Sequence, residues 1–180
     1  MNSPSLTPEA APTVKVGAVA GNPPARRRTR RLRTLRLVRE GPFPAPENYP
    51  AASVPIRTPR DVFDRMAPYA EREPVEVFWL LALDVQHRLI GGAPEAITRG
   101  ILNSSLVHPR EVFCAAIVSR AASVILCHNH PSGDPTPSAD DRAVTRQLVD
   151  AGRLLDIPVD DHVIVGKEAY LSFAEQGLLG

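Results

Sequence analysis

Apolar residues between positions 56 and 180 follow two spacings, one typical of amphipathic helices and the other of buried strands. Thr58 and Pro59 favour a helix start, because threonine is a good N-cap and proline fits the first helical position. Uninterrupted apolar stretches at Val77–Leu83 and Ser123–His128 are typical of strands buried on both faces. We predict a helix over 59–70, a strand over 75–84, its hairpin partner over 89–98, a helix over 109–121, a strand over 123–128, a long helix from 138 to about 155, a strand over 163–165 and a short helix over 172–176. Mixed strands and helices in this order predict an α/β sandwich built on a small sheet.

Residues typical of turns separate these elements. Gly91 and Gly92 interrupt the predicted hairpin partner. A loop rich in proline, glycine and serine follows the short strand and ends at Ser138. Because Asp141 stands three residues after Ser138, the pair fits a capping box at the start of the long helix.

The composition indicates one folded domain with a tail. Of the 180 residues, 43% are hydrophobic and 23% are charged, and the formal net charge is +1, which excludes a wholly disordered, highly charged chain. The longest apolar run, Val77–Leu83, is far shorter than the roughly 18 residues of a membrane span. Only Cys114 and Cys127 are present, and no cationic segment leads into an apolar stretch at the N-terminus. We therefore expect a cytoplasmic protein without a membrane span, a disulfide framework or a four-thiolate zinc site.

Residues 1–55 differ from the rest of the chain in charge and in proline content. They hold nine basic and three acidic side chains, whereas residues 56–180 hold 12 basic and 17 acidic ones. They also hold 10 of the 19 prolines, a density that neither helices nor central strands tolerate. We predict a disordered Pro/Arg-rich tail over 1–32, an edge strand and extended linker over 33–55, and one folded domain over 56–180.

The clustered arginines of the tail allow two interpretations. As a phosphate-binding arm, they would release counterions from nucleic acid. As a solvated tail, they would lead into the edge strand, with Leu35 and Leu37 facing inward, and this is the more common explanation of a charge run. No aromatic residues are interleaved for base stacking. The residues that would make this weak nucleic-acid contact are Arg26, Arg27, Arg28, Arg30 and Arg31.

His128 and His130 are the main candidates for chemistry. They stand two residues apart at the end of a predicted strand, so both imidazoles project to the same side. Neutral imidazole is a good zinc ligand. Asp141 can supply a third ligand, because it lies in the first helical turn, where the helix dipole favours a carboxylate. Two histidines and one aspartate leave a fourth position open for water, which is typical of a catalytic zinc site.

The alternative is a histidine-rich turn in which Asp141 serves only the helix dipole. The H-x-H spacing by itself is weak evidence for a metal site, but H-x-H followed by Pro-Ser-Gly and Ser-x-x-Asp is much more specific. Zinc nucleobase deaminases are excluded, because the chain contains neither H-x-E nor P-C-x-x-C. The H-E-x-x-H helix of other zinc proteases is also missing.

The segment HNHPSGDPTPSADD, residues 128–141, resembles the metal-binding signature of the JAB/MPN metallopeptidases, the JAMM pattern, in which H-x-H is followed after seven residues by S-x-x-D. Together with VHPREVF at Val107–Phe113 and DHVIVG at Asp161–Gly166, it resembles the RadC-like branch, over roughly residues 33–180. The resemblance implies an α/β fold of the JAB/MPN-like (cytidine-deaminase-like) type, with a mixed sheet flanked by helices. It also implies one zinc ion (Zn2+) per chain and hydrolysis of peptide or isopeptide bonds by a metal-bound water. The metal ligands would be His128, His130 and Asp141.

The same resemblance implies catalytic roles for two further residues. Glu76, at the start of the first predicted strand, matches the family glutamate that acts as general base. The alternative is a solvated strand end, with Glu73 as the fallback candidate. Ser138 matches the family serine, whose hydroxyl helps to stabilise the developing oxyanion. This hydroxyl can also cap the helix if it acts as both donor and acceptor.

The chain departs from the family pattern in two respects that matter here. The helix-hairpin-helix region that is common in the RadC family has no counterpart, and Asp156 stands where family members often have glycine. The competing function is a non-catalytic MPN-like binding module, associated with DNA repair or tethered to nucleic acid through the arginine arm. As a hydrolase, the chain would act on a peptide or protein substrate.

The remaining polar and sulfur-containing candidates have mainly structural explanations. Cys127 is predicted in the core, and Cys114 is predicted to pack on its helix. His108 precedes a predicted helix and could cap it. His162 either orients a metal ligand or makes a structural hydrogen bond. Asp134 could compete for the metal, but Asp141 fits the spacing better.

Overall fold

The computed structural model describes residues 54–100 and 107–180. The predicted tail over 1–32, with the arginines of the predicted arm, lies outside the described residues. The same holds for the predicted edge strand and linker up to residue 53. Among the helices of the described ranges, none combines the length and the apolar character needed to cross a membrane.

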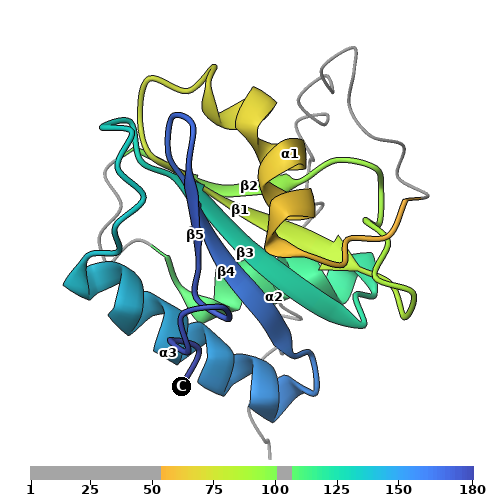
Figure 1. Cartoon of the computed structure of the whole chain (residues 1–180). Coiled ribbons are helices and arrows are strands. Elements are labelled where there is room, and N and C mark those ends of the chain that lie inside the picture. Colours follow the sequence, from red (N-terminus) through yellow and green to blue (C-terminus); the bar gives the residue numbers. More distant parts are fainter. Residues whose placement is uncertain (1–53, 101–106) are drawn as a thin grey trace, which may run out of the picture. The chain divides into compact units, whose positions relative to one another are not determined.

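Within the described residues, the centre of the domain is a five-stranded mixed sheet in the order β2-β1-β3-β4-β5 (Figure 1). β3 and β4 run parallel, and the other neighbouring strands run antiparallel. The strands are β1 Val77–Leu83, β2 Glu95–Arg99, β3 Ser123–Asn129, β4 Val159–Val165 and β5 Tyr170–Ser172. β1 and β3 are buried along their whole length, as their continuous apolar sequences predict.

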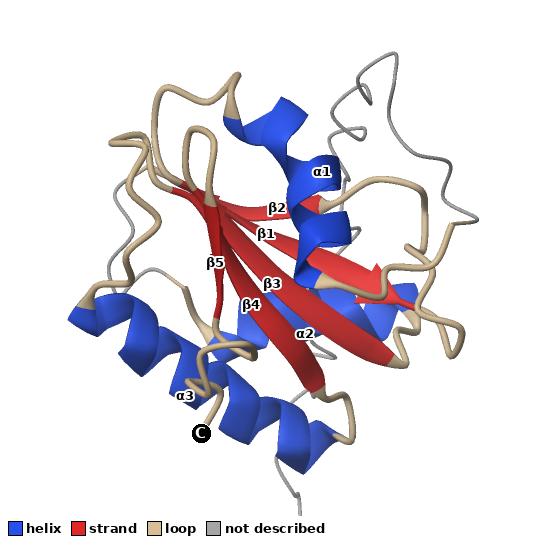
Figure 2. Cartoon of the chain, viewed as in Figure 1, coloured by secondary structure: helices blue, strands red, loops and turns tan. Residues whose placement is uncertain are grey.

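Helices cover both faces of this sheet, and each face has its own hydrophobic core. Figure 2 shows α1 (Pro59–Ala70) across the front of the sheet and α2 (Pro109–Ser119) behind it. Trp79 and Leu81 of β1 pack in the α1 core, whereas Phe78 and Leu80 pack with residues of α2 and of α3 (Ala139–Leu155). The alternation follows from the two-residue period of a strand. The predicted α/β class, with a mixed sheet flanked by helices, is confirmed.

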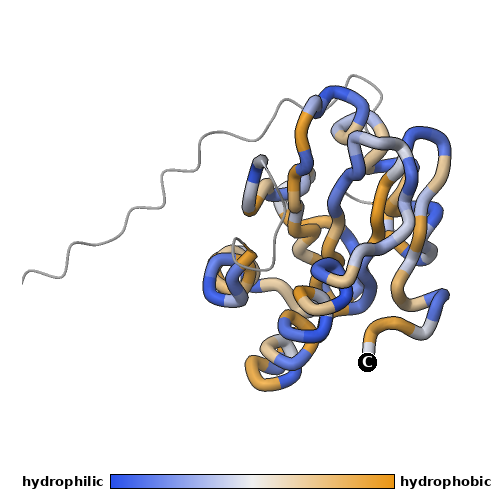
Figure 3. Tube along the Cα trace, turned by 90° about the vertical axis from the view of Figure 1, so that its left-hand side faces the viewer, coloured by the Kyte–Doolittle hydropathy of each residue, from blue (hydrophilic) through white to orange (hydrophobic). Residues whose placement is uncertain are grey.

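The helices begin where their capping residues predict. Thr58 and Asp61 form a capping box at α1, and Ser138 and Asp141 form one at α3. Figure 3 shows hydrophilic and hydrophobic stretches alternating along the coiled segments, as expected for helices with one face in a core.

Two strands differ from their predicted extents. β2 begins at Glu95, because Gly91 and Gly92 adopt positive φ angles of 79° and 77° and end the pairing that Leu89 starts with Leu83. β4 begins at Val159, four residues before the predicted start. Two acidic residues in this part of β4 concealed the strand from the hydrophobic pattern. Their carboxylates are hydrogen-bonded, Asp160 to the Ser123 hydroxyl and Asp161 to groups of the C-terminal segment.

The short C-terminal helix predicted over 172–176 is wrong. Ser172 ends β5 and pairs with Val163 of β4, and turns follow it. The buried Asp161 carboxylate accepts hydrogen bonds from the Ser172 hydroxyl at 2.6 Å and the Ala174 amide at 2.9 Å. These tertiary bonds hold the segment against β4 and outweigh its weak helical pattern.

Candidate metal centre

His128 and His130 lie at the C-terminal end of β3, the central strand of the sheet. His128 is fully buried, with Phe78 of β1 as its cross-strand partner. His130 follows the strand directly, and its amide donates to the Val165 carbonyl of β4 at 3.0 Å. The two Nε2 atoms are 3.0 Å apart, so the sheet alone brings both imidazoles to one point.

Asp141 reaches the same point from the first turn of α3. One carboxylate oxygen, Oδ1, is 3.3 Å from His128 Nε2, and the other, Oδ2, is 3.6 Å from His130 Nε2. Oδ2 also accepts hydrogen bonds from the backbone amide and the hydroxyl of Ser138, both at 2.7 Å. Burial by itself would raise the pKa of Asp141, but the two adjacent imidazoles and the hydrogen bonds from Ser138 lower it far below its usual range. Asp141 is therefore an anion at neutral pH, as a metal ligand must be.

Glu76 lies one residue before β1 and completes the group. Its Oε1 is 3.6 Å from His130 Nε2, and its side chain is 22% exposed. The possible ligand atoms of Glu76, His128, His130 and Asp141 all lie within 4.8 Å of one another. Glu73, the fallback candidate, instead pairs with Arg99. The structure thus brings together the four residues proposed as ligands and base, from three separate parts of the sequence.

The hydrogen bonds on the far side of each imidazole orient its Nε2 lone pair toward this group. His130 Nδ1 lies 2.7 Å from the Asp134 carbonyl oxygen, which can only accept, so the ring hydrogen is on Nδ1. His128 Nδ1 lies 2.8 Å from Nε2 of His162. Burial, followed by the nearby His128, lowers the pKa of His162 well below its ordinary value, so this imidazole is neutral.

A divalent metal fits this arrangement. Four tetrahedral ligands at about 2.0–2.1 Å from zinc lie about 3.3 Å from one another. The two Nε2 atoms are 3.0 Å apart, and they lie 3.3 Å (His128 to Oδ1) and 3.6 Å (His130 to Oδ2) from the oxygens of the Asp141 carboxylate. Two Nε2 atoms that face each other with their hydrogens on Nδ1 repel unless a cation lies between them. Imidazole and carboxylate ligands of this kind suit zinc.

Ser138 combines two hydrogen bonds in one hydroxyl. Its oxygen accepts from the Asp141 amide at 3.1 Å and its hydrogen goes to Asp141 Oδ2. In this geometry Ser138 caps α3 and orients the carboxylate of a candidate ligand. Its oxyanion role stays a prediction, and it requires the hydroxyl hydrogen to turn away from Asp141.

Sequence reasoning missed Asn129, the residue between the two histidines. Its buried side chain accepts from the Val77 amide at 2.8 Å and donates to the Val75 carbonyl at 3.1 Å. These two bonds hold the backbone on both sides of Glu76. The available signal was a polar amide directly after the apolar run of this strand, since a buried amide needs partners.

Two further residues make hydrogen bonds to histidines at or next to the candidate centre, Asp134 through its backbone and Thr145 from the next turn of α3. Asp134, the competing ligand that the sequence offers, acts on His130 through its main-chain carbonyl, while its carboxylate accepts hydrogen bonds from Thr136. Thr145 lies four residues after Asp141, on the same face of α3, and its hydroxyl is 2.6 Å from His162 Nδ1.

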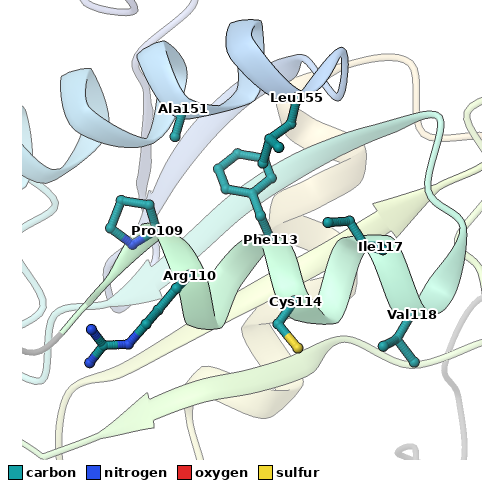
Figure 4. Close-up of a pocket in the computed structure, with 8 residues that line it drawn as sticks. All are labelled: Pro109, Arg110, Phe113, Cys114, Ile117, Val118, Ala151 and Leu155. Carbon is teal, nitrogen blue, oxygen red and sulfur yellow. The ribbon is translucent and has the colours of Figure 1, made fainter. Parts of the chain in front are cut away.

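The other candidates lie away from this group. Cys127 is buried as predicted, and burial raises the pKa of its thiol strongly. His108 is the N-cap residue of α2, but its side chain makes no capping bond. Cys114 was predicted to pack on its helix, but it is exposed. It lines a mainly apolar surface pocket between α2 and α3, together with residues such as Phe113 and Leu155 (Figure 4).

This chain is similar in sequence to known proteins. The family model of the RadC-like JAB domain matches residues 56–178. A UPF0758 protein of Symbiobacterium thermophilum is 48% identical over 130 residues, which cover 72% of this chain and 55% of that protein. A UPF0758 protein of Pelobacter propionicus is 49% identical over 122 residues, 68% of this chain and 52% of that protein. The chain thus spans about half the length of the curated relatives that it matches. It belongs to the RadC-like JAB domain family.

Proposed function

We propose that this chain is a zinc-dependent hydrolase of the metallopeptidase or isopeptidase type, with a peptide or protein substrate. The observation that carries the proposal is the convergence of Glu76, His128, His130 and Asp141, with all four ligand atoms within 4.8 Å. In this proposal, His128, His130 and Asp141 hold the metal. When bound, zinc would lower the pKa of a water molecule to about 7 and polarise the substrate carbonyl.

The proposed general base is Glu76. Its carboxylate lies beside His130 and is partly exposed, so it can reach both a water at the centre and a substrate. It would take a proton from the attacking water and pass it to the leaving amine as the carbon–nitrogen bond breaks. Asn129 fixes the backbone on either side of Glu76, which limits how far this carboxylate can move.

The test compares Glu76→Gln with Glu73→Gln in the zinc-loaded chain. We expect Glu76→Gln to keep its zinc and to hydrolyse peptide and isopeptide-linked substrates about 10²–10⁴-fold more slowly, the usual contribution of a general base. Glu73→Gln is the matched control, because Glu73 pairs with Arg99 and should leave turnover within a few-fold of the unaltered chain. Activity that survives in Glu76→Gln would exclude the proposed mechanism.

A further inference from the structure

A continuous chain of buried hydrogen bonds lies behind the candidate metal centre and joins two of its ligands. From His128, Nδ1 meets Nε2 of His162 at 2.8 Å. On the other side of the His162 ring, Nδ1 meets the Thr145 hydroxyl at 2.6 Å. This hydroxyl in turn meets the backbone carbonyl of Asp141 at 2.6 Å. His128, His162 and Thr145 are each 0% exposed, so water does not compete for these bonds.

The direction of each bond follows from the chemistry of the groups. The Asp141 carbonyl can only accept, so the single hydrogen of Thr145 Oγ1 points to it. Thr145 Oγ1 must then accept from His162, which puts the ring hydrogen of His162 on Nδ1. Complete burial disfavours a second, charge-producing hydrogen on His162, and its Nε2 is left as an acceptor. His128 therefore donates from Nδ1 and presents the lone pair of Nε2 to the metal centre.

The surroundings of His162 hold its ring in this orientation. Phe173 stacks on it with a centroid separation of 4.8 Å, and the Phe78 ring meets it edge-on at 5.4 Å. The His162 backbone is fixed as well, since its amide donates to Asp161 Oδ1 and its carbonyl accepts from the Phe173 amide. The ring cannot turn without breaking this packing. Since His128 and His162 share one hydrogen bond, the tautomer of His162 then decides that of His128.

We propose that His162 and Thr145 are positioning residues that set the tautomer of His128 and couple it to the helix turn that carries Asp141. The proposal rests on the metal site of the proposed function. The acceptor behind His128 is a neutral imidazole, whereas a carboxylate there would make the ligand more basic. His162 thus fixes the direction of His128 without adding negative charge to the site.

The experiment measures zinc affinity by competition with a chelator for the full chain and for three variants. Thr145→Val keeps the shape of Thr145 but removes the acceptor for His162 Nδ1–H, so His162 can place its hydrogen on Nε2 and force His128 to do the same. We expect zinc affinity to fall about 10–100-fold, the usual cost of losing such a partner. Thr145→Ser keeps the hydroxyl and should restore affinity to within about threefold. His162→Phe fits the aromatic surroundings, removes the acceptor and should weaken binding by a similar factor.

Nitrogen-15 spectra of the histidine rings give a readout that packing alone would not change. In the unaltered chain we expect the hydrogens of His128 and His162 on Nδ1, and in Thr145→Val we expect His162 to lose that preference. Zinc affinity within twofold of the unaltered chain in both Thr145→Val and His162→Phe would overturn the proposal. So would an unaltered chain whose His162 hydrogen is on Nε2.

The hydrogen-bond chain from His128 through His162 and Thr145 to Asp141 is called the relay below. These outcomes test the relay separately from the proposed function. A chain that binds zinc with the expected dependence on Thr145, yet hydrolyses no peptide or isopeptide bond, refutes the hydrolase and supports the relay. A chain that hydrolyses such bonds, with zinc affinity unchanged in the variants, supports the hydrolase and refutes the relay. A chain that binds no zinc refutes both.

Discussion

Asn129 shows how one side chain between two candidate ligands can serve a third functional residue. The side-chain amide of Asn129 makes hydrogen bonds to Val77 and Val75, the two neighbours of Glu76. The histidines on either side of Asn129 lie at the metal centre. A buried amide with both partners on one neighbouring segment acts as a clamp on that segment. Asn129 should therefore help to fix the position of Glu76.

Replacing Asn129 by alanine should slow turnover without removing the metal. None of the candidate ligands is lost, but Glu76 can move by about 1 Å, a displacement that can cost about 100-fold in rate. Steady-state kinetics should show the loss in kcat rather than KM, and zinc titration should show unchanged stoichiometry.

A double variant supplies the control for this clamp. If Asn129 acts through Glu76, Asn129→Ala combined with Glu76→Gln should be no slower than Glu76→Gln alone. Fully multiplicative losses would show that Asn129 contributes by another route.

At the scale of elements, the loop that carries the HPSGDP sequence is held against the end of β4 by two glycines. A Cβ on Gly166 would overlap the carbonyl oxygen of Gly133, and it would come within 3.1 Å of Pro135 Cδ. Gly133 itself adopts a φ of +87°, which favours glycine. The loop also supplies the Asp134 carbonyl that orients His130, so this close approach sets the geometry of a ligand.

Gly166→Ala should therefore weaken zinc binding by about tenfold or more, since His130 loses its orienting partner. It should also lower the free energy of unfolding by about 1–3 kcal/mol through overpacking. Chelator competition and urea denaturation measure the two effects.

Gly152→Ala is the matched control, because a Cβ there meets the Ile157 carbonyl at 2.6 Å and the Phe113 ring at 3.1 Å, away from the loop. It should destabilise the fold and leave zinc affinity unchanged. Equal zinc affinities in Gly166→Ala and the unaltered chain would contradict the role given to the loop.

The end of α3 has a backbone conformation that favours glycine over the aspartate that stands there. Asp156 is the C-cap residue and has a φ of 56°, in the left-handed region where glycine is usual. Its negative charge at a helix C-terminus is also unfavourable. Replacing Asp156 by glycine should raise the free energy of unfolding by about 0.5–1 kcal/mol, measured by urea denaturation. Asp156→Ala should give a smaller gain than glycine, because alanine removes the charge but keeps the steric cost; a gain equal to that of glycine would refute the conformational explanation.

The sequence predicted those elements whose signal is local. Thr58 and Ser138 marked the starts of α1 and α3, since a capping box is made within four residues. The start of β4, and the placement of Ser172 in a strand instead of a helix, depend on contacts between distant segments around Asp161. No local pattern contains such contacts. The H-x-H and Ser-x-x-Asp motifs predicted the centre, while the partners behind it, Thr145 among them, became visible only in three dimensions.

At the scale of the whole molecule, the candidate centre exists only when β1, β3 and α3 are assembled. Glu76 comes from the start of β1, the histidines from the end of β3, and Asp141 from the first turn of α3. In an unfolded chain these groups are far apart, so a metal that binds them adds its binding free energy to that of folding. At a free zinc concentration 100 times Kd, the folded state gains about 2.7 kcal/mol.

The most direct test is the zinc content of the purified full chain after loading and removal of excess metal, next to that of Asp141→Ala and Glu76→Gln. We expect about one zinc ion per chain in the unaltered protein and in Glu76→Gln, and little or none in Asp141→Ala, which lacks one of the three ligands. An unaltered chain that is folded yet holds no zinc, or an Asp141→Ala variant that keeps its full zinc content, would contradict the metal centre.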